Sequence, residues 1–276
     1  VQYQDALLKE YSFWMNGTDK LQKSGDSFEH VVMLPDGSIL NRYYDRIPEP
    51  RPEAYKEDVE IAKKSGREPK EIYTDLRAAA ESGWDFSSRW CAEDGELESI
   101  QTTKIIPVDL NSLLYNLEQS IALSWKLQKN SQEAQRYHQL AASRQAAILK
   151  YCWNKDQGFF FDYNFAAGKL MSVKSLAATY PLFFNLVNAE IAAAVGGVLE
   201  KEFLQPGGLV TTLQTTGQQW DAPNGWAPLQ WMAYKGLSNY KQDKLAQEIK
   251  IRWVKQNQRV FKATGKMMEK YNVMDT

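Results

Sequence analysis

Histidine and cysteine are scarce in this chain of 276 residues, which contains two of each. Cys91 and Cys152 are too few for a disulfide framework or a cysteine-rich zinc site. His30 and His138 lie far apart in the sequence, and we expect both to be ordinary surface or packing residues. Gly-x-Ser-x-Gly, a phosphate-binding glycine loop and His-Glu-x-x-His are also missing, which disfavours esterase, kinase and metalloprotease chemistry.

A surplus of charge and long hydrophobic runs are missing as well. The 33 basic and 34 acidic residues give a net charge of −1, without a basic patch that would favour binding to nucleic acid. No apolar run reaches the roughly 18 residues of a transmembrane helix, so no membrane span is expected. No low-complexity linker divides the chain, and its length can enclose one large core. We therefore expect a single domain over residues 1–276.

Apolar residues recur at helical spacing along most of the chain. The pattern predicts helices over residues 3–15, 53–64, 69–82, 111–129, 131–151, 182–203, 226–237, 242–256 and 260–270. Gly83 is expected to follow the end of the third of these helices, and Asp109 to cap the fourth. Short hairpins are expected within residues 31–44 and 153–170. These patterns indicate an all-α protein with antiparallel helix pairs, small hairpin excursions and only a few local strands.

Aromatic residues make up 12% of the chain, and one aromatic stretch is unusual. Residues 219–228, QWDAPNGWAP, combine two tryptophans with a carboxylate and two prolines. Pro223 and Pro228 disfavour both helix and strand, which predicts a rigid loop presenting flat rings beside a charged acceptor. Loops fixed on a helical scaffold often carry binding or catalytic groups. For a Trp–Asp pair alone, a turn that plugs the core is the alternative interpretation.

Two other segments also place a carboxylate beside apolar side chains near a predicted helix end. They are ESGWDFSSRW at residues 81–90 and MMEKY at residues 267–271. Together with residues 219–228, they resemble trehalases, the glycoside hydrolases that split the α,α-1,1 bond of trehalose. The resemblance implies an (α/α)6 toroid and hydrolysis of trehalose to two glucose molecules with inversion of configuration.

Glycoside hydrolysis needs one protonated carboxylic acid and one ionised carboxylate. Asp85 lies between Trp84 and Phe86, whose apolar side chains would raise its pKa and suit it to be the general acid. A helix-capping aspartate is the alternative, and Arg89 is expected to point elsewhere. The resemblance implies that Glu269 is the general base, although by itself it would be an ordinary solvated, helix-terminal glutamate. An inverting pair would be separated by roughly 6.5–9.5 Å.

The resemblance also implies sugar-binding roles for residues in three segments. An Arg and a Glu two residues apart can offer donors and an acceptor to neighbouring hydroxyl groups, as in residues 51–53. The alternative there is a proline-stiffened helix start. The substrate-binding residues expected on this basis are Arg51, Pro52, Glu53, Gly83, Trp84, Trp220 and Asp221.

Several motifs of the resembled family are missing from the chain. They are Pro-Gly-Gly-Arg-Phe, Arg-Ser-Gln-Pro-Pro and the glycine-rich loop expected after Glu269. We therefore expect an incomplete toroid that lacks N-terminal and C-terminal segments. The resemblance implies no metal or organic cofactor, and we expect a monomer that binds trehalose, with a periplasmic location favoured over a cytoplasmic one. A glucoamylase-like toroid enzyme and a non-catalytic helical scaffold are the alternatives.

Overall fold

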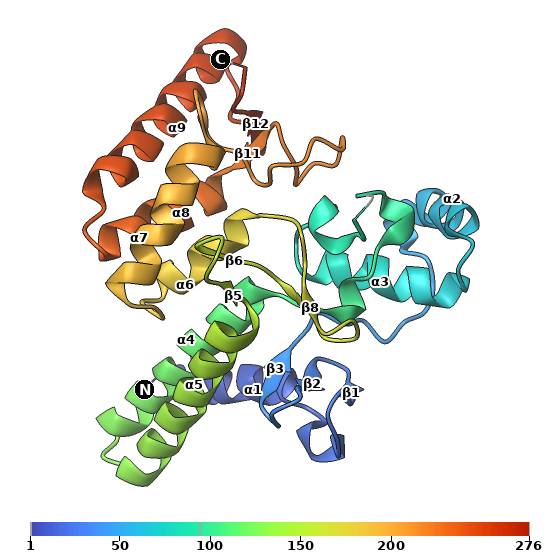
Figure 1. Cartoon of the computed structure of the whole chain (residues 1–276), viewed down its shortest axis with the longest axis vertical. Coiled ribbons are helices and arrows are strands. Elements are labelled where there is room, and N and C mark those ends of the chain that lie inside the picture. Colours follow the sequence, from blue (N-terminus) through green and yellow to red (C-terminus); the bar gives the residue numbers. More distant parts are fainter. Residues whose placement is uncertain (1, 94, 276) are drawn as a thin grey trace.

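The computed structural model describes residues 2–93 and 95–275, which are mostly helical (Figure 1). Nine α-helices lie within these ranges. They are α1 (Gln4–Trp14), α2 (Tyr55–Ser65), α3 (Pro69–Glu81), α4 (Val108–Leu127), α5 (Ser131–Tyr151), α6 (Tyr180–Phe183), α7 (Ala189–Val198), α8 (Ala227–Asn239) and α9 (Asp243–Thr264).

Short strands lie in the segments between the helices, and in the described part of the chain they pair antiparallel in sheets of two or three strands. The strands are β1 (Ser27–Phe28), β2 (Val31–Met33), β3 (Ile39–Asn41), β4 (Ile105–Ile106), β5 (Trp153–Asn154), β6 (Phe159–Phe160), β7 (Tyr163–Asn164), β8 (Lys169–Leu170), β9 (Leu204–Gln205), β10 (Gly208–Leu209), β11 (Asn224–Trp226) and β12 (Lys270–Asn272). The expected hairpins are confirmed by the pairing of β2 with β3 and of β5 with β6. The expectation that strands pair only locally is wrong in two places, because β4 pairs with β7 and β11 pairs with β12, and each pair joins distant parts of the chain.

Helices that follow one another pack in pairs. Helix α2 packs against α3, α4 against α5, and α8 against α9 (Figure 1). Only residues 128–130 connect α4 to α5, so these two long helices form an antiparallel hairpin. A shared core of buried apolar side chains joins the pairs, and its largest fully buried members include Trp90, Phe159, Phe160 and Phe203.

Three of the predicted helices differ from the structure by more than a few residues. The prediction of one helix over residues 182–203 is wrong, because α6 ends and a new helix begins after Asn188. The Asn188 side chain accepts a hydrogen bond from the backbone of Ile191 and so caps α7. The two helices predicted over residues 242–256 and 260–270 are one helix, α9, which ends before Gly265. A φ of +70° at Gly265 is a left-handed conformation that favours glycine and stops the helix.

The capping role predicted for Asp109 is also wrong. Helix α4 begins at Val108, and Pro107 occupies the capping position. Asp109 instead lies in the first turn, where both of its carboxylate oxygens bind Arg89 and one also accepts a hydrogen bond from the backbone N–H of Leu110. The prediction for Gly83 is confirmed, because it follows the last turn of α3 with a φ of +77°.

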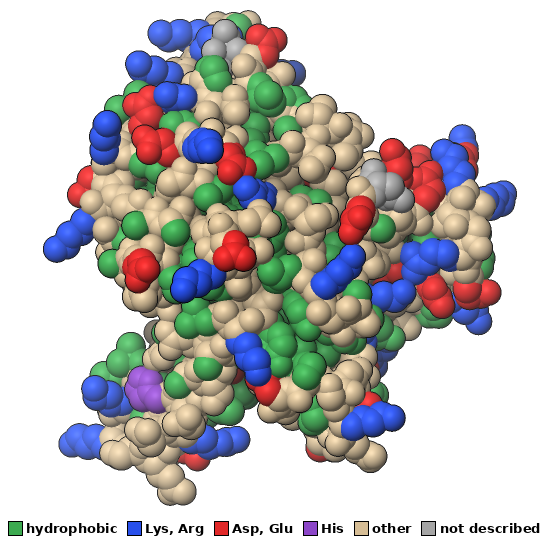
Figure 2. Space-filling view, in the orientation of Figure 1, with side chains coloured by type: hydrophobic (Ala, Val, Ile, Leu, Met, Phe, Trp, Pro, Cys, Tyr) green, Lys and Arg blue, Asp and Glu red, His purple; other side chains and the backbone are tan. Residues whose placement is uncertain are grey.

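Charges are interspersed on the surface. Figure 2 shows Lys and Arg side chains mixed with Asp and Glu side chains on the face in view, most of them toward its periphery. None of the helices in the described ranges is long and apolar enough to span a bilayer.

Candidate active site

The loop that carries Asp85 begins where α3 ends. After Gly83, the hydroxyl oxygen of Ser82 accepts a hydrogen bond from the backbone N–H of Trp84 at 3.0 Å. Trp84 is buried, Asp85 is partly exposed, and the chain then enters a short 3₁₀ turn, Ser88–Trp90. The loop therefore holds a buried ring on one side of Asp85 while its carboxyl group keeps some access to solvent.

Arg89 fixes this loop to the core. It is fully buried, and its guanidinium group forms two hydrogen bonds to Asp109 at 2.7 Å each. Two more, at 2.6 and 2.9 Å, reach Asp162, which follows β6. The guanidinium carbon also lies 4.6 Å from the ring centre of Trp84 and 4.4 Å from that of Trp90. Arg89 thus points away from Asp85, as expected, and joins the loop to the start of α4.

Asp221 connects the Asp85 loop to the loop before β11. It has no exposed surface, and one of its oxygens accepts hydrogen bonds from the hydroxyl groups of Ser87 and Ser88 at 2.8 and 2.9 Å. The backbone N–H of Ser88 binds the other oxygen at 2.8 Å. From its own loop, Thr212 and Thr216 donate at 2.8 and 2.5 Å. With both oxygens bound inside the protein, Asp221 anchors one loop to the other, and its expected role in sugar binding stays a prediction.

Figure 1 shows the same connection at the scale of the chain. The orange loop between β10 and β11 projects away from α8 and α9 toward the segment that follows α3. In that loop, the backbone N–H of Trp220 donates to the carbonyl oxygen of Phe86 at 3.0 Å. Two segments more than 130 positions apart in the sequence are therefore held side by side.

Glu269 does not lie on a helix, so that part of the prediction is wrong. It follows the end of α9 and directly precedes β12, which pairs with β11 in the register Trp226 with Lys270. The Glu269 side chain is 71% exposed and lies 3.2 Å from the ammonium group of Lys270. The prediction of a loop over residues 219–228 is thus wrong for its second half, where residues 224–226 form β11 and residues 227–228 begin α8. Pairing with β11 carries Glu269 to the same region as the Asp85 loop.

Three tryptophans stack between these segments. Trp220 stacks on Trp226 with ring centres 3.8 Å apart and planes 2° from parallel. It also stacks on Trp84 at 5.1 Å and 22°. The indole nitrogen of Trp226 donates to the carbonyl oxygen of Gln219 at 3.0 Å, which fixes the ring. Trp84 and Trp220, expected to bind sugar, are therefore brought together in one aromatic stack.

Residues 51–53 approach Asp85 from the start of α2. Arg51 is buried and forms two side-chain hydrogen bonds to Asp58, at 2.7 and 3.1 Å. Its guanidinium carbon lies 4.6 Å from the ring centre of Phe86, and its Nη1 takes no part in these bonds to Asp58. Pro52 and Glu53 are exposed in the 3₁₀ turn Pro52–Ala54.

The charges of these segments act on Asp85. Burial raises the pKa of the Asp85 carboxyl group above its usual value, while a backbone hydrogen bond within Asp85 and the charge of Arg51 lower it. The negative charges of Glu269 and Glu53 raise that pKa further. The structure therefore gathers Arg51, Glu53, Asp85 and Glu269 closely enough for their charges to interact. Proton donation is favoured for a carboxylic acid in such an environment.

The trehalase family model matches residues 1–276, the whole chain. The chain belongs to the trehalase family. It is 46% identical over 276 residues to the periplasmic trehalase of Salmonella newport, which covers 100% of this chain and 48% of that protein. The periplasmic trehalase of Citrobacter koseri is 44% identical over 275 residues, covering 99% of this chain and 48% of that protein. The chain thus spans about half the length of the curated relatives it matches.

Two solved structures of similar fold are a trehalase and a mannosylglycerate hydrolase. The neutral trehalase of Saccharomyces cerevisiae superposes with a TM-score of 0.78 at 24% identity, covering 99% of this chain and 53% of that chain. The mannosylglycerate hydrolase of Thermus thermophilus gives 0.53 at 19% identity, covering 62% and 41%. At these identities the likeness concerns the fold alone.

Glu53 offers a direct test of the electrostatics of this trehalase-family site. Replacing it by Gln removes a negative charge that raises the pKa of Asp85, so we expect that pKa to fall. Carbon NMR of the labelled Asp85 carboxyl group across a pH titration would measure the change. Glu57→Gln is the matched control, because Glu57 is exposed on α2 and is not among the charges that act most on Asp85. An unchanged or higher pKa in Glu53→Gln would contradict the arrangement.

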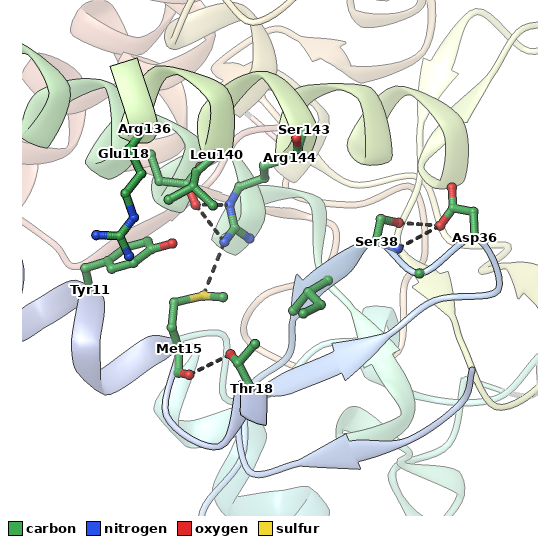
Figure 3. A pocket seen from close by; sticks show the side chains of 12 residues that line it. Tyr11, Met15, Thr18, Asp36, Ser38, Glu118, Arg136, Leu140, Ser143 and Arg144 are labelled. Carbon is green, nitrogen blue, oxygen red and sulfur yellow. Dashed lines mark hydrogen bonds and ion pairs between the residues drawn. The ribbon is translucent and has the colours of Figure 1, made fainter. Parts of the chain in front are cut away.

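A cavity of about 630 Å3 lies elsewhere, between α1, the β2–β3 hairpin, α4 and α5 (Figure 3). Arg144 lines this cavity, and its guanidinium group donates hydrogen bonds to Glu118 at 3.0 Å and to the sulfur of Met15 at 3.4 Å. None of the expected site residues lines this cavity. Because its lining contains none of these residues, we do not take this cavity as the candidate active site.

Sequence reasoning missed the residues that hold the site together. The adjacent hydroxyl residues Ser87 and Ser88 were a usable signal, since such a pair can satisfy a buried carboxylate. Gln219 was inside the recognised stretch but received no role. Its amide, with a donor and an acceptor, lies between the Asp85 loop and Lys270.

Proposed function

We propose that this chain carries the acid and base of a trehalase that hydrolyses trehalose to two glucose molecules. Asp85 donates its proton to the glycosidic oxygen as the bond to the anomeric carbon breaks. Glu269 accepts a proton from the water that attacks that carbon from the opposite face, so configuration inverts. The observation that carries this proposal is the convergence of two carboxyl groups with different environments, one partly buried with a raised pKa and one exposed.

The surrounding side chains suit a disaccharide. We infer that the Trp84–Trp220 stack forms an apolar wall and that Nη1 of Arg51 and the Glu53 carboxylate bind hydroxyl groups. Gly83 is exposed beside Trp84 and Asp85, and a Cβ there would contact nothing within 4 Å, so a sugar could approach the backbone closely. Family membership supports trehalose as the substrate.

We extend the proposal to the architecture around this site. Similarity to the yeast neutral trehalase supports an (α/α)6 toroid, to which this chain contributes one domain over residues 1–276. The periplasmic relatives support a periplasmic location. We propose a monomer that works without metal or organic cofactor, because an acid and a base suffice for the reaction.

Hydrolysis of trehalose by the full-length protein tests the proposal. Proton NMR recorded in the first minutes should show α-glucose and β-glucose in equal amounts, as inversion at one anomeric carbon requires. Maltose and mannosylglycerate serve as comparison substrates and should be cleaved far more slowly. Release of α-glucose alone, or faster cleavage of either comparison substrate, would contradict the proposed reaction.

A further inference from the structure

Gln219 touches both halves of the candidate site. Its Nε2 donates a hydrogen bond to the backbone carbonyl oxygen of Asp85. Its Oε1 accepts a hydrogen bond from the ammonium group of Lys270 at 3.1 Å. The same ammonium group lies 3.2 Å from Oε2 of Glu269. One side-chain amide therefore links the backbone that carries Asp85 to the cation that holds Glu269.

The backbone of Gln219 is itself held in place. Its carbonyl oxygen accepts hydrogen bonds from the side chains of Trp226 at 3.0 Å and Asn224 at 3.2 Å, both on β11. The next residue, Trp220, adds its backbone hydrogen bond to Phe86. These bonds fix the peptide group between Gln219 and Trp220, so the side chain of Gln219 starts from a defined position beside its two partners.

The tryptophan stack runs parallel to this polar link. Trp84, next to Asp85, stacks on Trp220, which stacks on Trp226. The ammonium group of Lys270, next to Glu269, lies 5.1 Å from the ring centre of Trp226. Stacked rings resist compression, whereas a hydrogen-bonded amide resists separation. Together they limit movement of the two segments in both directions.

We propose that Gln219 is a positioning residue that sets the separation and orientation of the Asp85 and Glu269 carboxyl groups. Water must fit between the base and the anomeric carbon while the acid reaches the glycosidic oxygen, so the reaction depends on this separation. The inference rests on the proposed acid and base roles for its consequence in catalysis, but the link itself is independent of them.

Glutamine suits this position because both ends of its amide are used. A glutamate would keep the acceptor for Lys270 but would face the Asp85 carbonyl oxygen without a proton to donate. It would also compete with Glu269 for the Lys270 charge. A methionine would keep the length of the side chain and lose both hydrogen bonds. Gln219→Met therefore removes the link with the least change in shape.

The first measurement is electrostatic and does not require activity. Glu269 raises the pKa of Asp85, so Glu269→Gln should lower that pKa in the full-length protein. Carbon NMR measures the size of this effect, once with Gln219 present and once in the Gln219→Met background. We expect a smaller effect in the Gln219→Met background, because the two segments then move apart or become mobile. An unchanged effect overturns the inference.

The second measurement separates positioning from substrate binding. We expect Gln219→Met to lower kcat for trehalose by about 10–100-fold with KM changed by less than about threefold, because misplacement of reacting groups costs rate. Gln218→Met is the control. Among the described residues, the backbone of Gln218 forms hydrogen bonds but its side chain forms none, so kcat should stay near the wild-type value. Equal effects at both positions overturn the inference. A reduced electrostatic effect with unchanged kcat would instead contradict the acid and base assignment.

Discussion

Asp85→Asn is expected to lower kcat for trehalose by about 10²–10⁴-fold, the usual contribution of a general acid, while the protein remains folded. Asparagine keeps the shape of the side chain but cannot donate the proton that the departing glucose needs. Asp85 is partly exposed, and its carboxyl group is not one of the buried anchors of the loop. Glucose release and the circular dichroism of the variant would be measured together.

The choice of substrate separates the roles of the two carboxyl groups. Fluoride is a good leaving group, so α-glucosyl fluoride needs little help from an acid, and Asp85→Asn should cleave it at a rate close to that of the wild type. Glu269→Gln should lose activity on both substrates, because activation of water is still required. Asp156→Asn, an exposed carboxylate in the turn after β5, is the control and should behave as the wild type. If Asp85→Asn hydrolyses trehalose normally, Asp85 is structural and the mechanism is wrong.

Arg89→Met is expected to lower the free energy of unfolding by about 3–5 kcal/mol, because it leaves two buried carboxylates without their partner. Asp109 and Asp162 are 3% and 2% exposed, and each forms two hydrogen bonds with Arg89. Burial alone would lower the pKa of Arg89, but the two carboxylates hold it well above its usual value. Urea denaturation of the full-length protein would measure the loss.

Arg136 provides the matched comparison. It forms an ion pair with Glu133 at 3.0 Å, but its side chain is 61% exposed and the pair lies on one face of α5. Arg136→Met should therefore cost no more than about 1 kcal/mol. Replacing Asp109 and Asp162 by Asn in the Arg89→Met variant should restore part of the lost stability, since no buried charge would remain. If Arg89→Met and Arg136→Met lowered the free energy of unfolding equally, the buried cluster would stabilise the fold no more than an exposed ion pair does.

Local sequence patterns predicted the helices well where burial and spacing agreed. The boundaries of α5 are those expected from the sequence, and the turn after α3 follows from Gly83. The pattern failed between α6 and α7, where apolar residues continue through a break imposed by the Asn188 cap. It failed again at Glu269, because the helical pattern before Gly265 gives no indication that the chain turns back to pair with β11.

The candidate site shows the same limit for individual side chains. Asp221 stands beside a tryptophan in a loop, a pattern that fits a sugar ligand as well as a buried anchor. Only the approach of Ser87 and Ser88, from more than 130 positions earlier in the chain, decides how its oxygens are used. The same holds for Gln219, whose partners Asp85 and Lys270 lie on different segments.

By itself, the sequence determined the helical class, the approximate positions of most helices, and three segments that resemble trehalases, because helix propensity, turn chemistry and short motifs are local properties. Family membership followed from comparison of the whole chain. Only the tertiary structure decided which side chains share the site and which are buried anchors. Burial, ion pairing and the pKa of Asp85 depend on neighbours brought together through space, and a linear pattern does not contain those distances.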